Sequence, residues 1–294
     1  MTAVEPVPVR RYRIQHRTTY RYSDDVSVSF GRAFLTPRTL PHQRCLDHRV
    51  SVDPDPSDHS TAVDVHGNRA TYFSVTSAYT RLEVTGTSVV EVSDPVRDPA
   101  VESAPWETAR PAGVDPLAVE YCLDSPLVEV DDAVQVYAGA TFRPGRPLGE
   151  AVDELTHRIH TDFRYDPRAS SVTSSVPDLL ASRAGVCQDF AHLAVACLRS
   201  VGLAGRYVSG YLATTPPPGR ERMVGVDASH AWAAVRGPDG SWLAFDPTND
   251  HRAGDRYTTV AWGRDYGDVS PLRGVLFTHA EKSEMAVSVD VAPL

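Results

Sequence analysis

Aromatic and β-branched side chains alternate with arginines near the start of the chain. Between residues 11 and 22, tyrosine, isoleucine, threonine and His16 share one face of an extended backbone, and arginine recurs on the other. A period of two is typical of a half-buried β-strand. Further strand-like runs, separated by turn-forming clusters, cover residues 26–35, 46–52, 70–77 and 81–92. These runs predict an all-β, sandwich-like N-terminal domain over residues 1–93.

Residues 94–116 separate this region from one with a different pattern. They contain five prolines and little periodicity, which predicts a linker or an extended segment lying on the next domain. Beyond them, helical spacing of apolar residues covers residues 148–161 and 187–201, and strand-like runs cover residues 205–213, 231–236, 241–245, 257–262 and 285–291. We therefore assign residues 117–294 to a second domain and the whole chain to the α+β class.

Composition and charge exclude several classes of protein. Of the 294 residues, 41% are hydrophobic and 8% aromatic, which is enough to bury a core and excludes a wholly disordered chain. The 29 basic and 38 acidic residues give a net charge of -9, and this balance argues against a nucleic-acid partner. The apolar stretches are too short for a membrane span, and residues 1–13 lack the apolar segment of a signal peptide. We expect no membrane partner and a cytoplasmic location.

The cysteines are scattered along the chain at positions 45, 122, 187 and 197, without C-x-x-C spacing. A structural zinc site or a disulfide framework is therefore not expected. The sequence also lacks the patterns of a calcium loop, a phosphate-binding loop and a dinucleotide fingerprint. We expect neither a metal nor a cofactor.

Cys187 follows Gly185 at the start of the second predicted helix. A thiol at the positive end of a helix dipole is favoured in its nucleophilic thiolate form. A buried structural thiol is the ordinary explanation of a lone cysteine, and we assign that role to Cys45, Cys122 and Cys197.

Two histidines could serve Cys187 as a general base. His192 lies five positions further along the same helix, about 140° around its axis, and so points away. His230 begins a strand-like run and must approach from another element, as is usual for Cys/His pairs. Asp246 ends an apolar strand and could hold the imidazole tautomer, although Asp–Pro is also ordinary turn chemistry.

Four ordered motifs carry a resemblance to a known family: Gly-Val-Cys-Gln-Asp-Phe-Ala-His around Cys187, residues 205–211, Asp-Ala-Ser-His-Ala-Trp around His230, and Phe-Asp-Pro-Thr-Asn around Asp246. They resemble the transglutaminase-like superfamily and, more narrowly, its bacterial branch of cysteine proteases. The segment 263–271 resembles the same branch, and the β-rich N-terminal part resembles a domain commonly fused to these cores. The resemblance implies a papain-like α+β core with the Cys-bearing helix packed on an antiparallel sheet.

Carried over to this chain, the resemblance implies Cys187 as the nucleophile, His230 as the general base and Asp246 as the orienting carboxylate. The backbone N–H of Cys187 is a natural oxyanion donor. The Tyr165 hydroxyl is a second candidate because some relatives place an aromatic donor upstream, although a merely packed aromatic ring is the more ordinary interpretation. Gln188 follows the nucleophile instead of preceding it, so a papain-style glutamine donor is not expected.

We therefore expect a thiol-dependent amide-bond hydrolase, a peptidase or amidase, that acts on a peptide or protein through an acyl-enzyme. Hydrolysis is favoured over amine transfer because water is always present, whereas transfer needs a second site that excludes water. One alternative is a protein-glutamine or peptide transamidase. Bacterial relatives also occur beside peptide-ligating enzymes, so such an enzyme system is a candidate partner. The other alternative is a non-catalytic peptide-binding module that retains the three residues.

Two surface features are each open to two interpretations. The arginine face of the first strand is expected to be a solvated face, and a polyanion site is the alternative. The proline-rich loop at residues 214–222 lies between the Cys and His motifs, so it either covers the cleft or is an ordinary surface loop.

Overall fold

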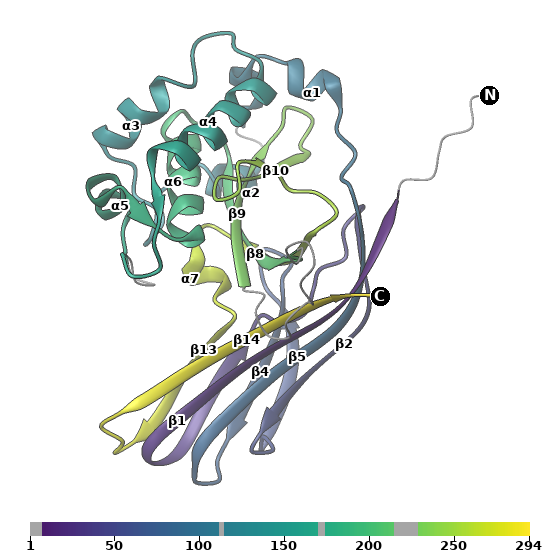
Figure 1. The fold of residues 1–294 in the computed structure, drawn as a ribbon, viewed down its shortest axis with the longest axis vertical. Coiled ribbons are helices and arrows are strands. Elements are labelled where there is room, and N and C mark those ends of the chain that lie inside the picture. The colour runs from purple at the N-terminus through teal and green to yellow at the C-terminus, as the bar shows by residue number, and fades with distance from the viewer. Residues whose placement is uncertain (1–7, 112–114, 170–173, 215–228) are drawn as a thin grey trace, which may run out of the picture.

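The computed structural model describes residues 8–111, 115–169, 174–214 and 229–294. One half of the molecule is a curled sheet of long antiparallel strands, and the other half carries the helices around a second sheet (Figure 1). The predicted α+β class is confirmed.

The curled sheet is built around one very long strand. Its seven strands are β1 (Val9–Ala33), β2 (Gln43–Asp53), β3 (Asp58–Val63), β4 (Arg69–Val75), β5 (Tyr79–Ser93), β13 (Leu272–Thr278) and β14 (Ser283–Pro293). The first half of β1 pairs with β5 and β14, and its second half pairs with β4 and β13. The register with β5 shifts between Arg21 and Val26. Because β1 serves both halves, the predicted sandwich is a single hydrogen-bonded sheet that curls over its own apolar core.

The C-terminal strands belong to this sheet by their hydrogen bonds. Val289 and Val291 of β14 are buried in a cluster with Tyr12 and Ile14 of β1. Placing residues 117–294 in one core therefore did not anticipate the pairing of β13 and β14 with the N-terminal strand. The alternation of a strand predicts which face is buried but does not name its partner. The division of the chain at residues 93 and 116 otherwise stays a prediction.

Residues 94–111 pack against the helical half. They contain α1 (Pro99–Ser103), capped by the Asp98 side chain, and the short 3-10 helix η1 (Trp106–Ala109). The Trp106 ring is buried in the main apolar core, and its Nε1–H donates a hydrogen bond of 2.8 Å to the Arg143 carbonyl. This segment therefore packs on the helical half, and it contains two short helices where its prolines predict a linker or extended backbone.

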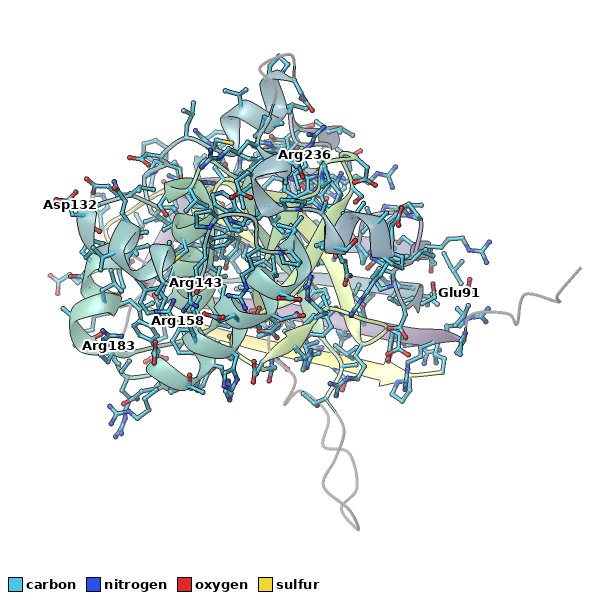
Figure 2. All side chains as sticks on the ribbon, turned by 90° about the horizontal axis from the view of Figure 1, so that it is seen from above. Glu91, Asp132, Arg143, Arg158, Arg183 and Arg236 are labelled. Carbon is cyan, nitrogen blue, oxygen red and sulfur yellow. The ribbon has the colours of Figure 1, made fainter. Side chains whose placement is uncertain are left out.

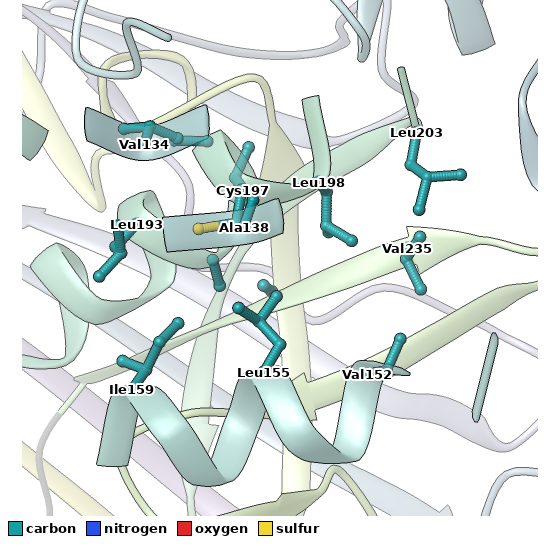
Figure 3. Close-up of a cluster of buried hydrophobic side chains, with 14 of the residues drawn as sticks. Val134, Ala138, Val152, Leu155, Ile159, Leu193, Cys197, Leu198, Leu203 and Val235 are labelled. Carbon is teal, nitrogen blue, oxygen red and sulfur yellow. The ribbon is translucent and has the colours of Figure 1, made fainter. Parts of the chain in front are cut away.

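The remaining helices are α2 (Pro116–Glu120), α3 (Asp132–Gly139), α4 (Leu148–Asp162), α5 (Val176–Ser182), α6 (Cys187–Ser200) and α7 (Tyr266–Val269). Helices α3, α4, α5 and α6 contribute side chains to the largest apolar core. Leu155 and Ile159 of α4 lie opposite Leu193 and Cys197 of α6 in this core (Figure 3). Burial raises the pKa of Cys197 to about 12, which agrees with the structural role assigned to that thiol. Among the described residues, no helix has the length and apolar character needed to cross a bilayer.

Helix α6 packs on an antiparallel sheet with the order β11-β10-β9-β8-β12. The strands are β8 (Gly205–Leu212), β9 (Ser229–Arg236), β10 (Trp242–Asp246), β11 (His251–Arg252) and β12 (Tyr257–Gly263). A two-stranded parallel pair, β6 (Arg164–Tyr165) and β7 (Ala184–Gly185), precedes α6. The start of α6 and the ends of β9 and β10 are therefore the elements that carry the predicted site residues.

The arginine face of β1 meets carboxylates on the neighbouring strand β5. Glu91 accepts hydrogen bonds from Arg11 and Arg44, and Arg17 lies 3.6 Å from Glu83. Figure 2 places Glu91 near the edge of the molecule opposite the labelled Asp132 and Arg183 of the helical half. The arginines are exposed and form ion pairs with these glutamates, as is usual on a solvated strand face.

Candidate active site

Cys187 is the first residue of α6. A residue of the helix itself caps its N-terminus: the Asp189 carboxylate accepts a hydrogen bond of 2.8 Å from the backbone N–H of Val186. A side chain at Gly185 would come within 2.7 Å of that same carboxylate, so the turn into the helix requires glycine. The Cys187 thiol is half-buried at the positive end of the helix dipole, an environment that favours a thiolate.

His230 and Asp246 come from neighbouring strands of the sheet beneath α6. The imidazole Nε2 and the carboxylate Oδ2 are 2.6 Å apart. Burial by itself lowers the pKa of His230, but the Asp246 carboxylate and the Cys187 thiol outweigh burial and raise this pKa to about 10. Since Nε2 is held by Asp246, the other ring nitrogen, Nδ1, is left to interact with Cys187. The structure thus brings all three predicted residues together, while their catalytic roles stay predictions.

The Asp246 carboxylate is completely buried, and both of its oxygens accept hydrogen bonds. Oδ2 accepts from His230, from the Tyr257 hydroxyl at 2.7 Å and from the Asn249 amide at 2.7 Å. Oδ1 accepts the backbone N–H groups of Thr248 and Asn249. Burial raises the pKa of Asp246, but these donors and the His230 charge outweigh it and lower this pKa to about 2. The carboxylate is therefore held ionised and fixed in orientation.

Sequence reasoning missed the two side chains that hold this carboxylate. Asn249 stands inside the Asp-Pro-Thr-Asn motif, so its nearness to Asp246 could have been noticed. Tyr257 reaches Asp246 from β12, a strand buried along almost its whole length, and its sequence gives no sign of a polar role. Only the folded arrangement of the strands brings that hydroxyl to the carboxylate.

His192 lies apart from this network, in agreement with its expected helical position. It is buried, and its Nε2 accepts the Tyr266 backbone N–H at 3.1 Å. Burial lowers the pKa of His192 to about 4, so the ring is neutral at physiological pH.

Tyr165 lies on β6, opposite Gly185 of β7 in the register. Its ring is 55% exposed and packs edge-on against Phe190 at 6.5 Å between centroids. Burial and the nearby Cys187 thiol raise the pKa of Tyr165, which places its hydroxyl in the electrostatic reach of the nucleophile. A role as oxyanion donor stays a prediction. Gln188 is buried and lines the cleft on the carboxyl-terminal side of Cys187.

Cys187 and His230 line a cleft of about 280 Å³, which we call the catalytic cleft, whereas the buried Asp246 is not part of its lining. One wall is the helical half, with Cys187 and His230. The other wall is the curled sheet, an arrangement that the sequence did not reveal. This sheet wall consists of side chains from β1, β13 and β14: His16, Thr18, Tyr20, Leu272, Met285 and Val287.

His16 is an uncharged residue of the sheet wall. Its Nδ1 lies 3.1 Å from the Tyr211 hydroxyl, and its Nε2 lies 3.1 Å from the Thr18 hydroxyl. Burial lowers the pKa of His16 to about 4, because neither hydroxyl supplies a charge to offset desolvation.

Within the described parts of the chain, no group of three or more His, Cys, Asp or Glu side chains is arranged to hold a metal ion. Residues 215–222 of the predicted covering loop lie outside the described residues, as do Asp227 and Ala228 of the His230 motif.

Comparisons with known proteins agree with the resemblance noted in the sequence. Residues 12–91 match the bacterial transglutaminase-like N-terminal region, and residues 136–247 match the transglutaminase-like superfamily. An uncharacterized protein of Mycobacterium tuberculosis is 51% identical over 293 residues, covering 96% of this chain and 93% of the relative. An uncharacterized protein of Mycobacterium leprae is 33% identical and covers 97% of this chain and 99% of the relative.

Two further comparisons relate the chain to a bacterial transferase by sequence and to a solved structure by fold. A protein-glutamine gamma-glutamyltransferase of Pseudomonas aeruginosa is 32% identical over 92 residues, which cover 30% of this chain and 14% of that protein. The solved structure of a candidate cysteine protease from Cytophaga hutchinsonii has a TM-score of 0.75 and 20% identity and covers 98% of both chains, a likeness that establishes the fold. These findings support a thiol-dependent enzyme in general, and the chain belongs to the transglutaminase-like superfamily.

Proposed function

We propose that the protein is a thiol-dependent amide-bond hydrolase that acts on peptide or protein segments. One observation carries the proposal: Cys187 begins a helix beside His230, and His230 is held by the buried, fully hydrogen-bonded Asp246. This is the arrangement that an activated thiol nucleophile needs, with a base next to the nucleophile and a third group that orients the base.

The first half of the reaction forms an acyl-enzyme. His230 Nδ1 holds the proton of the Cys187 thiol, and the thiolate sulfur attacks the carbonyl carbon of the amide. The Cys187 N–H and the Tyr165 hydroxyl are the donors that we propose for the oxyanion. His230 then gives its proton to the departing amine nitrogen, the C–N bond breaks, and a thioester remains.

The second half releases the acid. Water attacks the thioester carbon while His230 Nδ1 takes a proton from it, the C–S bond breaks, and the proton returns to the Cys187 sulfur. Asp246 stays ionised throughout and keeps the Nε2–H of His230 directed toward itself.

Amine transfer is the second candidate function. It is favoured by the similarity of part of this chain to the Pseudomonas aeruginosa gamma-glutamyltransferase. In that reaction an amine nitrogen replaces water as the attacking atom on the same thioester. We also propose a cytoplasmic location and a link to a peptide-ligating enzyme system.

The test uses β-casein as an unfolded protein substrate, with and without added methylamine, and identifies the products by mass. We expect cleaved or deamidated products whose formation is lost in Cys187→Ala and retained in Cys45→Ala, since Cys45 is a half-buried thiol on β2. Methylamine adducts in place of hydrolysis products would favour transfer. Equal turnover by Cys187→Ala and the wild type would overturn the proposal.

A further inference from the structure

A second pocket lies beside the catalytic cleft, inside the curl of the sheet. It has a volume of about 130 Å³, and its concave lining is mainly aromatic and aliphatic: Tyr20, Tyr22, Phe73, Tyr79, Leu272 and Leu276. We call it the distal pocket. Tyr20 and Leu272 also line the catalytic cleft, so the two cavities are adjacent and share a boundary.

Strand β1 runs along both cavities with one face. His16 and Thr18 border the catalytic cleft, Tyr20 borders both cavities, and Tyr22 borders the distal pocket. These positions alternate, and a strand advances about 3.3 Å per residue, so the face from His16 to Tyr22 spans about 20 Å. An extended peptide has the same rise and can follow this face with alternate side chains directed toward it.

The lining of the distal pocket selects for an uncharged side chain. Tyr20 and Tyr22 are stacked, Tyr22 meets Tyr79 edge-on, and the Tyr79 hydroxyl is satisfied by Ser29 at 2.6 Å. Arg273 is the charged residue of the lining. It stands opposite Arg32 in the register and alternates with Leu272, which assigns its side chain to the other face of β13. A charged group entering this pocket would lose its hydration without gaining a partner.

The volume fits one ring. An apolar cavity of about 150 Å³ holds a benzene molecule, so a pocket of about 130 Å³ accepts a single aromatic ring or a branched aliphatic side chain. Neighbouring apolar side chains extend the same surface at the mouth of the cleft, where Met285 is 62% exposed.

We propose that the distal pocket binds an aromatic or large aliphatic side chain of the same peptide whose carbonyl reacts at Cys187. The inference rests on the proposed function, because it takes that peptide to be the substrate. The chemical class of the substrate is then an extended, uncharged peptide segment with one bulky apolar residue a few positions from the reacting carbonyl. The curled sheet acts as the specificity wall of the cleft.

The test uses acetyl-tetrapeptide chloromethyl ketones of alanine in which a single phenylalanine is moved from position to position. The Cys187 sulfur displaces chloride from these probes, so a C–S bond forms as the C–Cl bond breaks, and the rate of alkylation is read by peptide mass. At one position, phenylalanine is expected to raise the rate by about tenfold or more over the all-alanine probe, from the burial of its ring.

A matched pair of variants tests the pocket itself. Leu276 stands opposite the buried Ser29 in the register, on the concave face, and is 38% exposed. Phe277 is its neighbour on the opposite face, is 57% exposed and does not line the pocket. Leu276→Asp is expected to abolish the gain from phenylalanine, and Phe277→Asp to retain it. Both variants should react with iodoacetamide at the wild-type rate, since neither position touches Cys187 or His230.

Each other outcome decides against the pocket. No gain at any position, the same gain in Leu276→Asp, or an equal loss in both variants would overturn the proposal. The corresponding peptide amides, titrated by calorimetry, separate this failure from a failure of the proposed function. If Cys187 is inert toward every electrophile, the hydrolase proposal fails, and tighter binding of the phenylalanine amide in the wild type than in Leu276→Asp still decides whether the distal pocket is a side-chain site.

Discussion

His230 and His16 face the same cleft from opposite walls, and their proton affinities are shifted in opposite directions. Both rings are largely buried. Asp246 and Cys187 raise the pKa of His230 to about 10, whereas burial lowers the pKa of His16 to about 4. The two rings differ in their partners, because His230 meets a carboxylate and a thiol and His16 meets two hydroxyls. Charge partners, more than burial, decide which histidine can carry a proton here.

The two walls of the catalytic cleft therefore differ in chemical character. The helical wall carries the charged pair of His230 and Asp246. The free-energy cost of burying the Asp246 carboxylate is low because hydrogen-bond donors surround it. The sheet wall carries hydroxyl and apolar side chains around a neutral His16. We infer that the helical wall performs the chemistry and that the sheet wall selects the substrate.

The largest effect is expected from removing the nucleophile. Cys187→Ala should lower turnover by at least about a thousandfold, because the covalent route is lost while substrate binding remains. The thermal midpoint should stay close to that of the wild type, since the thiol is only half-buried. Turnover and thermal unfolding are measured on the same samples, and residual activity above one-tenth of the wild type would contradict the covalent mechanism.

Asp246→Ala is expected to lower both activity and stability. The variant leaves His230 without its carboxylate, and breaking such a buried pair costs about 3 kcal/mol in the free energy of unfolding. The pair stabilises fully between about pH 4 and 6.5. Its contribution declines as pH rises through the raised pKa of His230, about 10, and as pH falls toward the lowered pKa of Asp246, about 2.

The matched control for Asp246 is Asp250→Ala, which removes a nearby carboxylate paired with the exposed His157. Its cost should stay below about 1 kcal/mol. Chemical denaturation from pH 5 to pH 10 measures both variants. A loss in Asp246→Ala that is equal at all pH values would mean that no charged pair stabilises the fold.

His16 should give the opposite pH dependence. Burial lowers the pKa of His16 from 6.5 in the unfolded chain to about 4 in the folded chain. Between these pH values, His16 is mostly protonated in the unfolded chain and mostly neutral in the folded chain. The free energy of unfolding should therefore fall as pH drops from 6.5 to 4, by on the order of 3 kcal/mol from this residue. In His16→Gln, which keeps a hydrogen-bonding side chain, the fall should be smaller by that amount. An unchanged acid dependence would show that His16 is charged in the folded protein.

The smallest effect is expected from Tyr257→Phe. The variant removes one of the donors to Asp246 Oδ2, while His230 and Asn249 still bond that oxygen. One hydrogen bond to a buried carboxylate is worth about 1 to 2 kcal/mol, so turnover should fall about fivefold to thirtyfold, with a shift in the pH profile. A loss as large as that of Asp246→Ala would instead place the Tyr257 hydroxyl at the reacting atoms.

The sequence predicted the elements that carry the chemistry because their signals are local. The helix that begins at Cys187, the strand that begins near His230 and the strand that ends at Asp246 each follow from the spacing of apolar residues. The ordered motifs then related them to one family. Local signals of this kind can be recognised in the sequence without knowledge of the fold.

The second wall of the cleft could not be predicted in the same way. Tyr20 and Met285 are 265 positions apart and stand opposite each other on the sheet only because β14 pairs with β1. The predicted alternation put His16 on the inner face, but it could not tell what that face meets. The contact of Tyr257 with Asp246 has the same origin, since it depends on strand order and not on spacing.

The central claim is that His230 activates Cys187, and the pH dependence of iodoacetamide alkylation tests it most directly. Cys45 and Cys122 serve as internal controls, because they are also half-buried and burial raises the pKa of each. We predict that Cys187 reacts at pH 6, far below the value of about 8.5 at which a free thiol ionises, and that His230→Ala abolishes this reaction. If Cys187 reacts no faster than Cys45 and Cys122 in both proteins, the thiol is not activated and the account is wrong.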